Sequence, residues 1–357
     1  MCIRDSLYHD QLNFLPGTIS NPETIYLRTT HMTRALESLQ QVFTGIYPST
    51  ARAPGFIPTI TTRKNSDDVL YPNKFFCPRF NELTKLYSEK AVQRWDNSPE
   101  MDHLNEKLGP WMPDASQKVS VVGHPSTVGI LDTINSSLAH GPETRLPDVF
   151  YEDQVRANID KISVYEWYLG YMQNREYREL GIGAQVGDIV ASAVKHAEAV
   201  ADGAEERSPK LAVNGCHDTT LAGILSSMGI FDNSPPRFTS TLAVETFRKK
   251  GLGTSASADM AVIAKAEPIS RTSSAELSDE QKGRLKDWYV RVRYNDKPLT
   301  VPGCRGPGKH LEGDESFCTL VAFKEIADKF TPRNWKEACL KNLNKGVIDE
   351  ENIDAGY

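Results

Sequence analysis

Two short segments place residues with anion-binding and proton-donating chemistry directly after an apolar strand. Arg28 follows the run Thr24–Leu27, and His217 and Asp218 follow the run Leu211–Val213 almost two hundred residues later. A guanidinium binds a phosphate or carboxylate in bidentate geometry, a protonated imidazole holds an anionic oxygen, and a carboxyl group donates a proton to a departing alkoxide. These residues predict an anion-binding site with a proton donor, and neither role requires a metal.

Each of these residues also has a structural interpretation. An arginine near a strand end is often a surface residue paired with a carboxylate, so Arg28 by itself does not indicate a ligand. Asp218 also fits the first turn of a helix as a cap, with His217 as an ordinary loop residue. The functional interpretation is favoured because the two groups occupy equivalent positions on two strands.

Both segments predict a strand, a polar turn and an amphipathic helix. Apolar residues at spacings of three and four across residues 32–46 predict the first helix, which Pro48 ends. The same pattern across residues 221–228 predicts the second helix, which stops at Gly229. Ligands of open α/β sheets bind at the carboxyl ends of the strands, so we expect the two junctions to share one site.

The rest of the chain predicts a ribbon and a helical region. Ser240–Phe247 and Trp288–Tyr294 alternate with period two, as two half-buried strands of an antiparallel pair do. Residues 248–287 between them lack a sustained apolar pattern and predict a long, flexible insertion. Residues 63–185 are rich in aromatic residues and contain several helical patterns.

Charge and hydropathy exclude two classes of partner. The 357 residues contain 41 Lys and Arg against 47 Asp and Glu, which gives a net charge of −6. A broad nucleic-acid-binding face normally requires a basic excess, so we expect no nucleic-acid partner. No run of 18 apolar residues occurs, so we expect no transmembrane segment.

The six cysteines include no CxxC pair, which argues against structural zinc. Cys304, His310 and Cys318 lie close together in the sequence, but we favour a Cys304–Cys318 disulfide over a metal-ligand set, provided that the compartment is oxidising. We therefore expect no metal.

Several motifs resemble those of the histidine acid phosphatases. The likeness covers most of the chain outside residues 248–287 and rests on Arg28–Arg34 with the helix that follows, on the His-Asp motif within Asn214–Thr220, and on the closing strand near Tyr294–Pro298 and Val301–Cys304. Leu70–Asn73 and Gly229–Asp232 resemble the lysophosphatidic acid phosphatase branch of this family.

The resemblance implies an α/β fold with a mixed central sheet flanked by helices, like that of phosphoglycerate mutase, and with an inserted, mostly helical cap. The expected α/β core comprises residues 1–62 and 186–357, with 248–287 as its flexible insertion. Residues 63–185 are the expected cap and substrate region.

The resemblance also implies site roles in a phosphomonoesterase that works through a phosphohistidine and needs no cofactor. Arg28 matches the phosphate-clamping arginine, His217 the second histidine that contacts the phosphate, and Asp218 the proton donor to the leaving group. We interpret Arg34, one helical turn further on, as a structural residue that pairs with a carboxylate.

The nucleophilic histidine of the family lies in an Arg-His-Gly-x-Arg-x-Pro motif, which this sequence lacks. The only His-Gly pair is His140-Gly141, and only 27 residues precede Arg28. We expect an N-terminally truncated chain without its first strand and nucleophile loop, which is inactive as given. The alternatives are a non-catalytic pseudo-phosphatase that binds phosphoesters and a mutase-like phosphotransferase.

A small or lysolipid phosphate monoester is the expected substrate. Residues 63–185 contain 14 Lys and Arg against 18 Asp and Glu, which disfavours a polyphosphorylated substrate. Trp95, Trp111 and Trp167 either line an acyl groove or pack the cap. The resemblance implies an intracellular compartment such as the mitochondrion, and the sequence indicates no oligomeric state.

Overall fold

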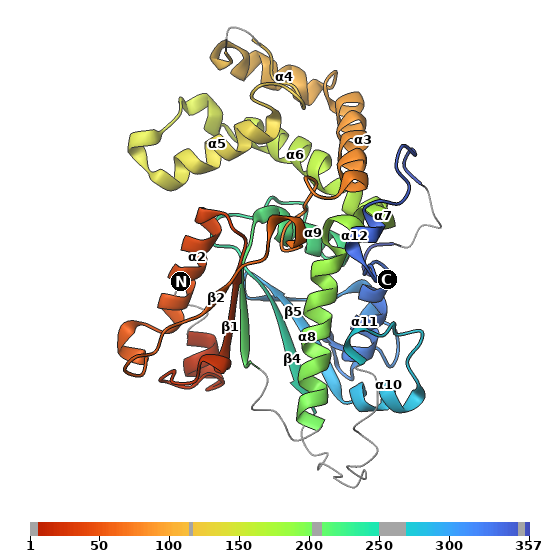
Figure 1. Cartoon of the computed structure of the whole chain (residues 1–357). Helices are drawn as coiled ribbons and strands as arrows, with labels where there is room; N and C mark the ends of the chain where they lie inside the picture. The colour runs from red at the N-terminus through yellow and green to blue at the C-terminus, as the bar shows by residue number, and fades with distance from the viewer. Residues whose placement is uncertain (1–5, 114–116, 202–208, 250–268, 349–353) are drawn as a thin grey trace.

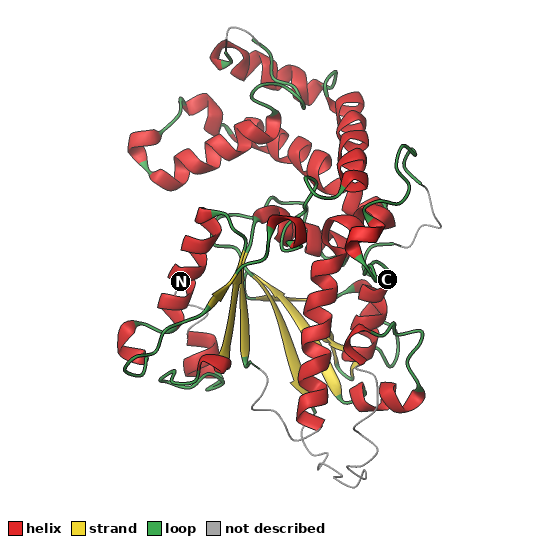
Figure 2. Cartoon of the chain, in the orientation of Figure 1, coloured by secondary structure: helices red, strands yellow, loops and turns green. Residues whose placement is uncertain are grey.

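The computed structural model describes residues 6–113, 117–201, 209–249, 269–348 and 354–357. One half of the molecule is built on strands and the other half consists of helices (Figures 1 and 2). The strands are β1 (Ile25–Thr29), β2 (Ile60–Thr61), β3 (Leu211–Gly215), β4 (Leu242–Arg248), β5 (Trp288–Tyr294), β6 (Lys297–Leu299), β7 (His310–Leu311) and β8 (Asp314–Thr319).

The strands form two sheets, whereas the sequence analysis expects one mixed central sheet. The first sheet is parallel in the order β2-β1-β3, and the second is antiparallel in the order β4-β5-β8-β7, with β6 paired to β5. Within the described residues, β3 is an edge strand of the first sheet and β4 is an edge strand of the second, and no backbone ladder joins the two strands. The predicted pairing of β4 with β5 is confirmed, as is the α/β fold with helices around the strands.

Side chains connect the two sheets where no backbone ladder does. Tyr8 packs against the apolar cluster around β1, and its hydroxyl donates a hydrogen bond to Glu245 on β4 over 3.0 Å. Glu245 also accepts a hydrogen bond from Arg291 on β5 over 2.8 Å. Because Glu245 is almost fully buried, these donors provide the polar partners that a buried carboxylate needs.

The helices around the strands are α2 (Thr33–Ile46), α8 (Ala184–Ala201), α9 (Asp218–Ser227), α10 (Asp279–Leu285), α11 (Leu320–Asp328) and α12 (Trp335–Ala338). Two of them, α2 and α9, are the helices predicted after Arg28 and after His217, and their bounds agree with the prediction to within three residues. The apolar spacing explains α2, since Ala35, Leu39 and Phe43 form its buried face.

The helical half contains α3 (Pro78–Trp95), α4 (Pro99–Leu108), α5 (Thr127–His140), α6 (Asp153–Gln173) and α7 (Arg175–Arg178). We call residues 63–185 the cap, and these boundaries remain our proposal. The distal parts of α3 to α6 share one apolar cluster, whereas the ends of α3 and α6 near the strands belong to the main cluster of the core. Within the described part of the chain, no helix combines the length and apolarity needed to cross a bilayer.

Part of the expected flexible insertion is ordered, which corrects the prediction for residues 269–287. The helix α10 begins with a capping box formed by Ser278 and Gln281, and Leu285 at its end is fully buried. The capping box and the buried leucine explain this order, although the segment has no sustained apolar period. Residues 250–268 of the same insertion lie outside the described residues.

Two disulfides are present among the described residues. Cys304–Cys318 is the predicted pair and closes a loop with a sequence separation of 14. Cys77–Cys339 has a separation of 262 and joins the start of the cap to the segment after α12. Next to it, the fully buried Arg79 binds Glu176 through two nitrogens and donates hydrogen bonds to the carbonyl oxygens of Lys345 and Gly346.

We expect the Cys77–Cys339 disulfide to stabilise the chain more than Cys304–Cys318. Loop-closure entropy assigns about 5 kcal/mol to the long loop and about 3 kcal/mol to the short one. Urea unfolding of the Cys77→Ala/Cys339→Ala and Cys304→Ala/Cys318→Ala variants measures both contributions. An equal or larger loss of free energy of unfolding in the second variant would contradict the expectation.

Candidate active site

The two predicted junctions lie side by side. β1 and β3 pair in parallel, with Arg28 opposite Asn214 and Thr29 opposite Gly215. A Cβ atom on Gly215 would lie 2.7 Å from the carbonyl oxygen of Ala35, so the glycine allows α2 to pack closely on β3. The N-termini of α2 and α9 therefore lie beside one another at the carboxyl ends of β1 and β3.

His217 is the residue immediately before α9. Its Nε2 lies 3.1 Å from Oγ1 of Thr30, and the ring of Tyr71 packs against the imidazole edge to face, with 6.0 Å between the ring centroids. Burial lowers the pKa of His217 below its usual value, and the positive charges of Arg34 and His31 act in the same direction. The neutral imidazole is therefore favoured until an anion arrives.

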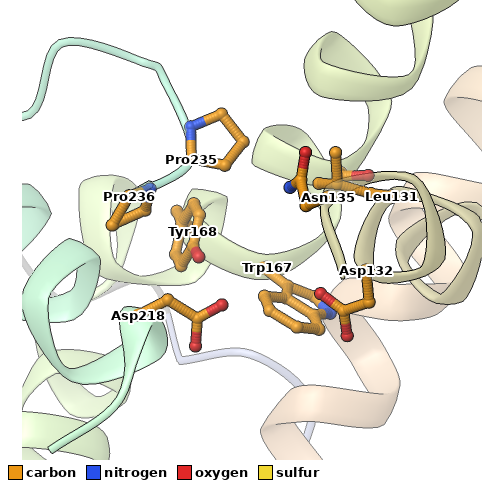
Figure 3. Close-up of a pocket in the computed structure, with 9 residues that line it drawn as sticks. Leu131, Asp132, Asn135, Trp167, Tyr168, Asp218, Pro235 and Pro236 are labelled. Atoms are coloured by element: carbon orange, nitrogen blue, oxygen red, sulfur yellow. The ribbon is translucent and has the colours of Figure 1, made fainter. Parts of the chain in front are cut away.

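Asp218 is the first residue of α9, and its side chain is exposed. One carboxylate oxygen accepts a hydrogen bond from the backbone N–H of Thr219 over 2.8 Å. The other side of the carboxylate faces a pocket between α9 and the cap, in which Asp132 and Tyr168 are near neighbours (Figure 3). Asp218 therefore points at the space where a bound molecule would sit.

Arg28 does not face this space, which differs from the sequence expectation. Its side chain is 3% exposed, and Nη2 donates to the fully buried Asp68 over 3.0 Å. Nη1 lies 3.3 Å from Gln185 and 3.4 Å from Asp188. Because the guanidinium is already held by two carboxylates, we assign Arg28 no contact with a bound anion.

Asp68 links Arg28 to the segment that packs on His217. The same oxygen that accepts from Arg28 also accepts the backbone N–H of Leu70 over 3.0 Å. The carbonyl oxygen of Leu70 in turn accepts the hydroxyl of Thr220 on α9 over 2.8 Å. Arg28 and Asp68 thus fix the turn that carries Tyr71.

Arg34 is exposed and unpaired among the described residues, unlike Arg28. It lies exposed in the first turn of α2 and has no hydrogen bond or ion pair with any residue that the structure describes. The expected carboxylate partner of a structural arginine is therefore not observed. Its charge instead lowers the pKa of His217 and also acts on Asp132.

A comparison with known protein families identifies the chain. The model of the histidine phosphatase superfamily (branch 2) matches residues 4–295. The chain belongs to this superfamily. A probable acid phosphatase of Schizosaccharomyces pombe is 32% identical over 342 residues, covering 93% of this chain and 72% of that protein. Human lysophosphatidic acid phosphatase type 6 is 24% identical over 347 residues, covering 96% of this chain and 67% of that protein.

Two solved phytase structures show the same fold. The phytase from Citrobacter braakii superposes with a TM-score of 0.54 at 10% sequence identity, covering 95% of this chain and 86% of the phytase. Hafnia alvei phytase in complex with tartrate also gives a TM-score of 0.54, at 14% identity, with coverage of 93% and 84%. These similarities establish the architecture of this histidine phosphatase chain.

Several site residues of this histidine phosphatase chain are missed by sequence reasoning. Asp68, Tyr71, Asp132 and Tyr168 come from the segment before α3, from α5 and from α6, far in sequence from the two junctions. No periodic signal indicates that they meet there. Among the described residues, no group of three or more His, Cys, Asp or Glu side chains could hold a metal ion.

The two arginines should differ sharply in their effect on stability. We expect Arg28→Met to lower the free energy of unfolding by about 3–5 kcal/mol, because it leaves Asp68 buried without its partner. Arg34→Met should change it by less than about 0.5 kcal/mol, as for most exposed residues. Urea unfolding of both variants tests this contrast. Equal destabilisation by the two substitutions would show that the buried pair is not a structural anchor.

Proposed function

We propose that the site binds the phosphate group of a phosphate monoester between His217, Arg34 and the N-terminus of α9. Asp218 is the proposed proton donor to the leaving oxygen. The proposal rests on one observation. His217 and Asp218 lie at the start of α9, directly after β3, and β3 pairs with β1, the strand that leads to Arg34. Membership of a phosphatase family supports it.

Arg34 replaces Arg28 in this proposal for an electrostatic reason. A dianionic phosphate needs a cation that is not neutralised by a carboxylate, and Arg28 is already paired with Asp68 and Asp188. Arg34 has no such partner among the described residues, and its charge reaches His217. A bound phosphate would also raise the pKa of His217 and so favour the imidazolium form, which adds a second positive charge.

The proposed chemistry is phosphoryl transfer to a histidine followed by hydrolysis. A bond forms between a histidine nitrogen and phosphorus while the bond from phosphorus to the ester oxygen breaks. The proton of the neutral Asp218 carboxyl goes to that oxygen, which leaves as an alcohol. Asp218 then takes a proton from the water that attacks the phosphohistidine, which releases phosphate and restores the carboxyl group.

The nucleophile for this sequence of steps is not His217, because His217 is assigned to the phosphate. The 357 residues contain eight histidines and no Arg-His-Gly-x-Arg-x-Pro motif. His140, in the only His-Gly pair, lies at the end of α5, where its Nδ1 is 2.9 Å from the carbonyl oxygen of Ser136. We therefore propose that these residues bind phosphate monoesters without turning them over.

A small or lysolipid monoester is the proposed ligand. The similarity to a protein named lysophosphatidic acid phosphatase supports it, as does the excess of acidic residues in the cap. Trp167 lines the pocket beside Asp218, whereas Trp95 is buried in the cap and Trp111 is an exposed neighbour of Phe150. Of the three tryptophans, only Trp167 lies where it can contact a bound ester at this pocket.

A second candidate is a phosphoester-binding protein without catalytic activity. The absence of the nucleophile motif from the 357 residues favours it. This candidate uses the same site and the same contacts. It differs from the first only in lacking the covalent step, so turnover by a form of the protein that carries an Arg-His-Gly-x-Arg-x-Pro motif distinguishes the two.

Anion binding should strengthen as the pH falls. Burial and Arg34 lower the pKa of His217, so the imidazole must gain a proton to bind an anion. Above that pKa, affinity rises by up to about tenfold for each unit by which the pH falls. Calorimetric titration with sulfate, whose charge is constant between pH 4 and about pH 8, measures this dependence. His217→Gln should flatten it, and Arg34→Met should weaken binding by about tenfold. A pH dependence that survives His217→Gln would contradict the assignment.

The chain should bind phosphate but not hydrolyse p-nitrophenyl phosphate at pH 5. We expect no release of p-nitrophenol above the buffer rate, since covalent catalysis requires a nucleophile. Turnover that withstands removal of contaminating phosphatase would overturn this proposal. His31→Ala is then the first variant to test, because His31 is the other histidine whose charge acts on His217.

A further inference from the structure

The pocket beside Asp218 lies between the cap and the core. It is a small pocket lined by side chains of α5 and α6, by Asp218 and by the loop after α9. In Figure 3, Asp132 and Asp218 approach the pocket from opposite sides, with the ring of Trp167 between them. None of the residues that line it is basic, and its lining includes Asp132, Asn135, Ser163, Trp167, Tyr168 and Asp218.

Two polar side chains of this pocket, Asp132 and Ser163, lack protein partners among the described residues. Asp132 makes no hydrogen bond or ion pair with the residues that the structure describes, and its side chain is exposed at the pocket wall. Ser163 is 2% exposed, and its hydroxyl has no hydrogen-bond partner among them. Buried polar groups are normally hydrogen-bonded, so an unpaired hydroxyl at a pocket wall indicates a site for a polar ligand or for water.

Tyr168 and Asn135 add two donors to the same wall. Tyr168 is 2% exposed, and Figure 3 shows its hydroxyl directed toward Asp218. Burial raises the pKa of Tyr168 well above its usual value, and the charges of Asp218 and Asp132 act in the same direction, so the phenol keeps its proton. The Oδ1 of Asn135 accepts a hydrogen bond from Arg156 over 2.9 Å, which leaves its amide nitrogen as a donor.

We propose that this pocket is a leaving-group subsite that accepts a neutral or cationic alcohol with hydroxyl or ammonium groups, and that Asp132 selects against a second anionic group. The proposal rests on the proposed function, because Asp218 is the group that would protonate the ester oxygen at the mouth of the pocket. The two carboxylates accept hydrogen bonds from hydroxyl or ammonium groups. Ser163, Tyr168 and Asn135 donate hydrogen bonds to hydroxyl oxygens.

Electrostatics makes Asp132 the selective residue of the subsite. Desolvation by burial raises the pKa of Asp132, and the negative charge of Asp218 on the other side of the pocket raises it further, against the opposing effect of Arg34. An anionic leaving group would add a third negative charge where no basic residue lines the wall. Specificity then comes from repulsion of the wrong ligand as well as from contacts with the right one.

The test compares the affinities of phosphoethanolamine, glycerol 3-phosphate, 3-phosphoglycerate and inorganic phosphate for the full chain by calorimetry at pH 7. We expect phosphoethanolamine and glycerol 3-phosphate to bind about tenfold more tightly than 3-phosphoglycerate. Asp132→Asn should reduce the preference for phosphoethanolamine over 3-phosphoglycerate by about tenfold. Asp102→Asn, which removes the same charge from α4 outside the pocket, is the matched control and should leave that ratio unchanged.

The possible results separate the subsite from the phosphate site. Suppose that the four compounds bind but Asp132→Asn leaves the preference for phosphoethanolamine over 3-phosphoglycerate unchanged, or Asp102→Asn changes it equally. The subsite proposal is then contradicted, and the phosphate-site proposal is not. If none binds, inorganic phosphate included, the phosphate site and the subsite are both overturned. Asp132→Ser repeats the measurement if Asp132→Asn does not fold.

Discussion

The buried ion pair between Arg28 and Asp68 connects the sheet to the site. Nη2 of Arg28 and the backbone N–H of Leu70 share one oxygen of Asp68, so the end of β1 holds the turn that places Tyr71 against His217. Both charges are almost fully removed from water, and each therefore depends on the other. This constraint explains why Arg28, at a strand end where the sequence predicts a ligand, is instead paired with Asp68.

Because of this ion pair, Arg28 and Arg34 have different proposed roles. Arg28 is neutralised by carboxylates inside the molecule, whereas Arg34 keeps its charge at the surface, one helical turn further along the chain. In the proposed site, Arg34 supplies positive charge for the phosphate, whereas Asp132 of the cap and Asp218 at the start of α9 supply negative charge at the pocket (Figure 3). An ester with an anionic phosphate and a neutral or cationic alcohol has the complementary polarity.

Local patterns in the sequence are sufficient to predict β1, β3, α2 and α9, because hydrophobic spacing reports directly on which face of an element is buried. The role of Arg28 is not predictable in the same way, since its partners Asp68 and Asp188 lie 40 and 160 residues away. The Cys77–Cys339 disulfide and the pocket wall on α5 and α6 likewise depend on long-range contacts. The separation into two sheets also carries no local signal, because it depends on which strand edges meet.

The central claim is that a phosphate binds at Arg34 and His217 and leaves Arg28 in its buried ion pair. Nitrogen-15 NMR of the arginine and histidine side chains during a titration with inorganic phosphate tests it most directly. The account predicts that the signals of Arg34 and His217 shift together with phosphate concentration, while the Arg28 signals stay unchanged. Shifts at Arg28 with an unchanged Arg34 would contradict it.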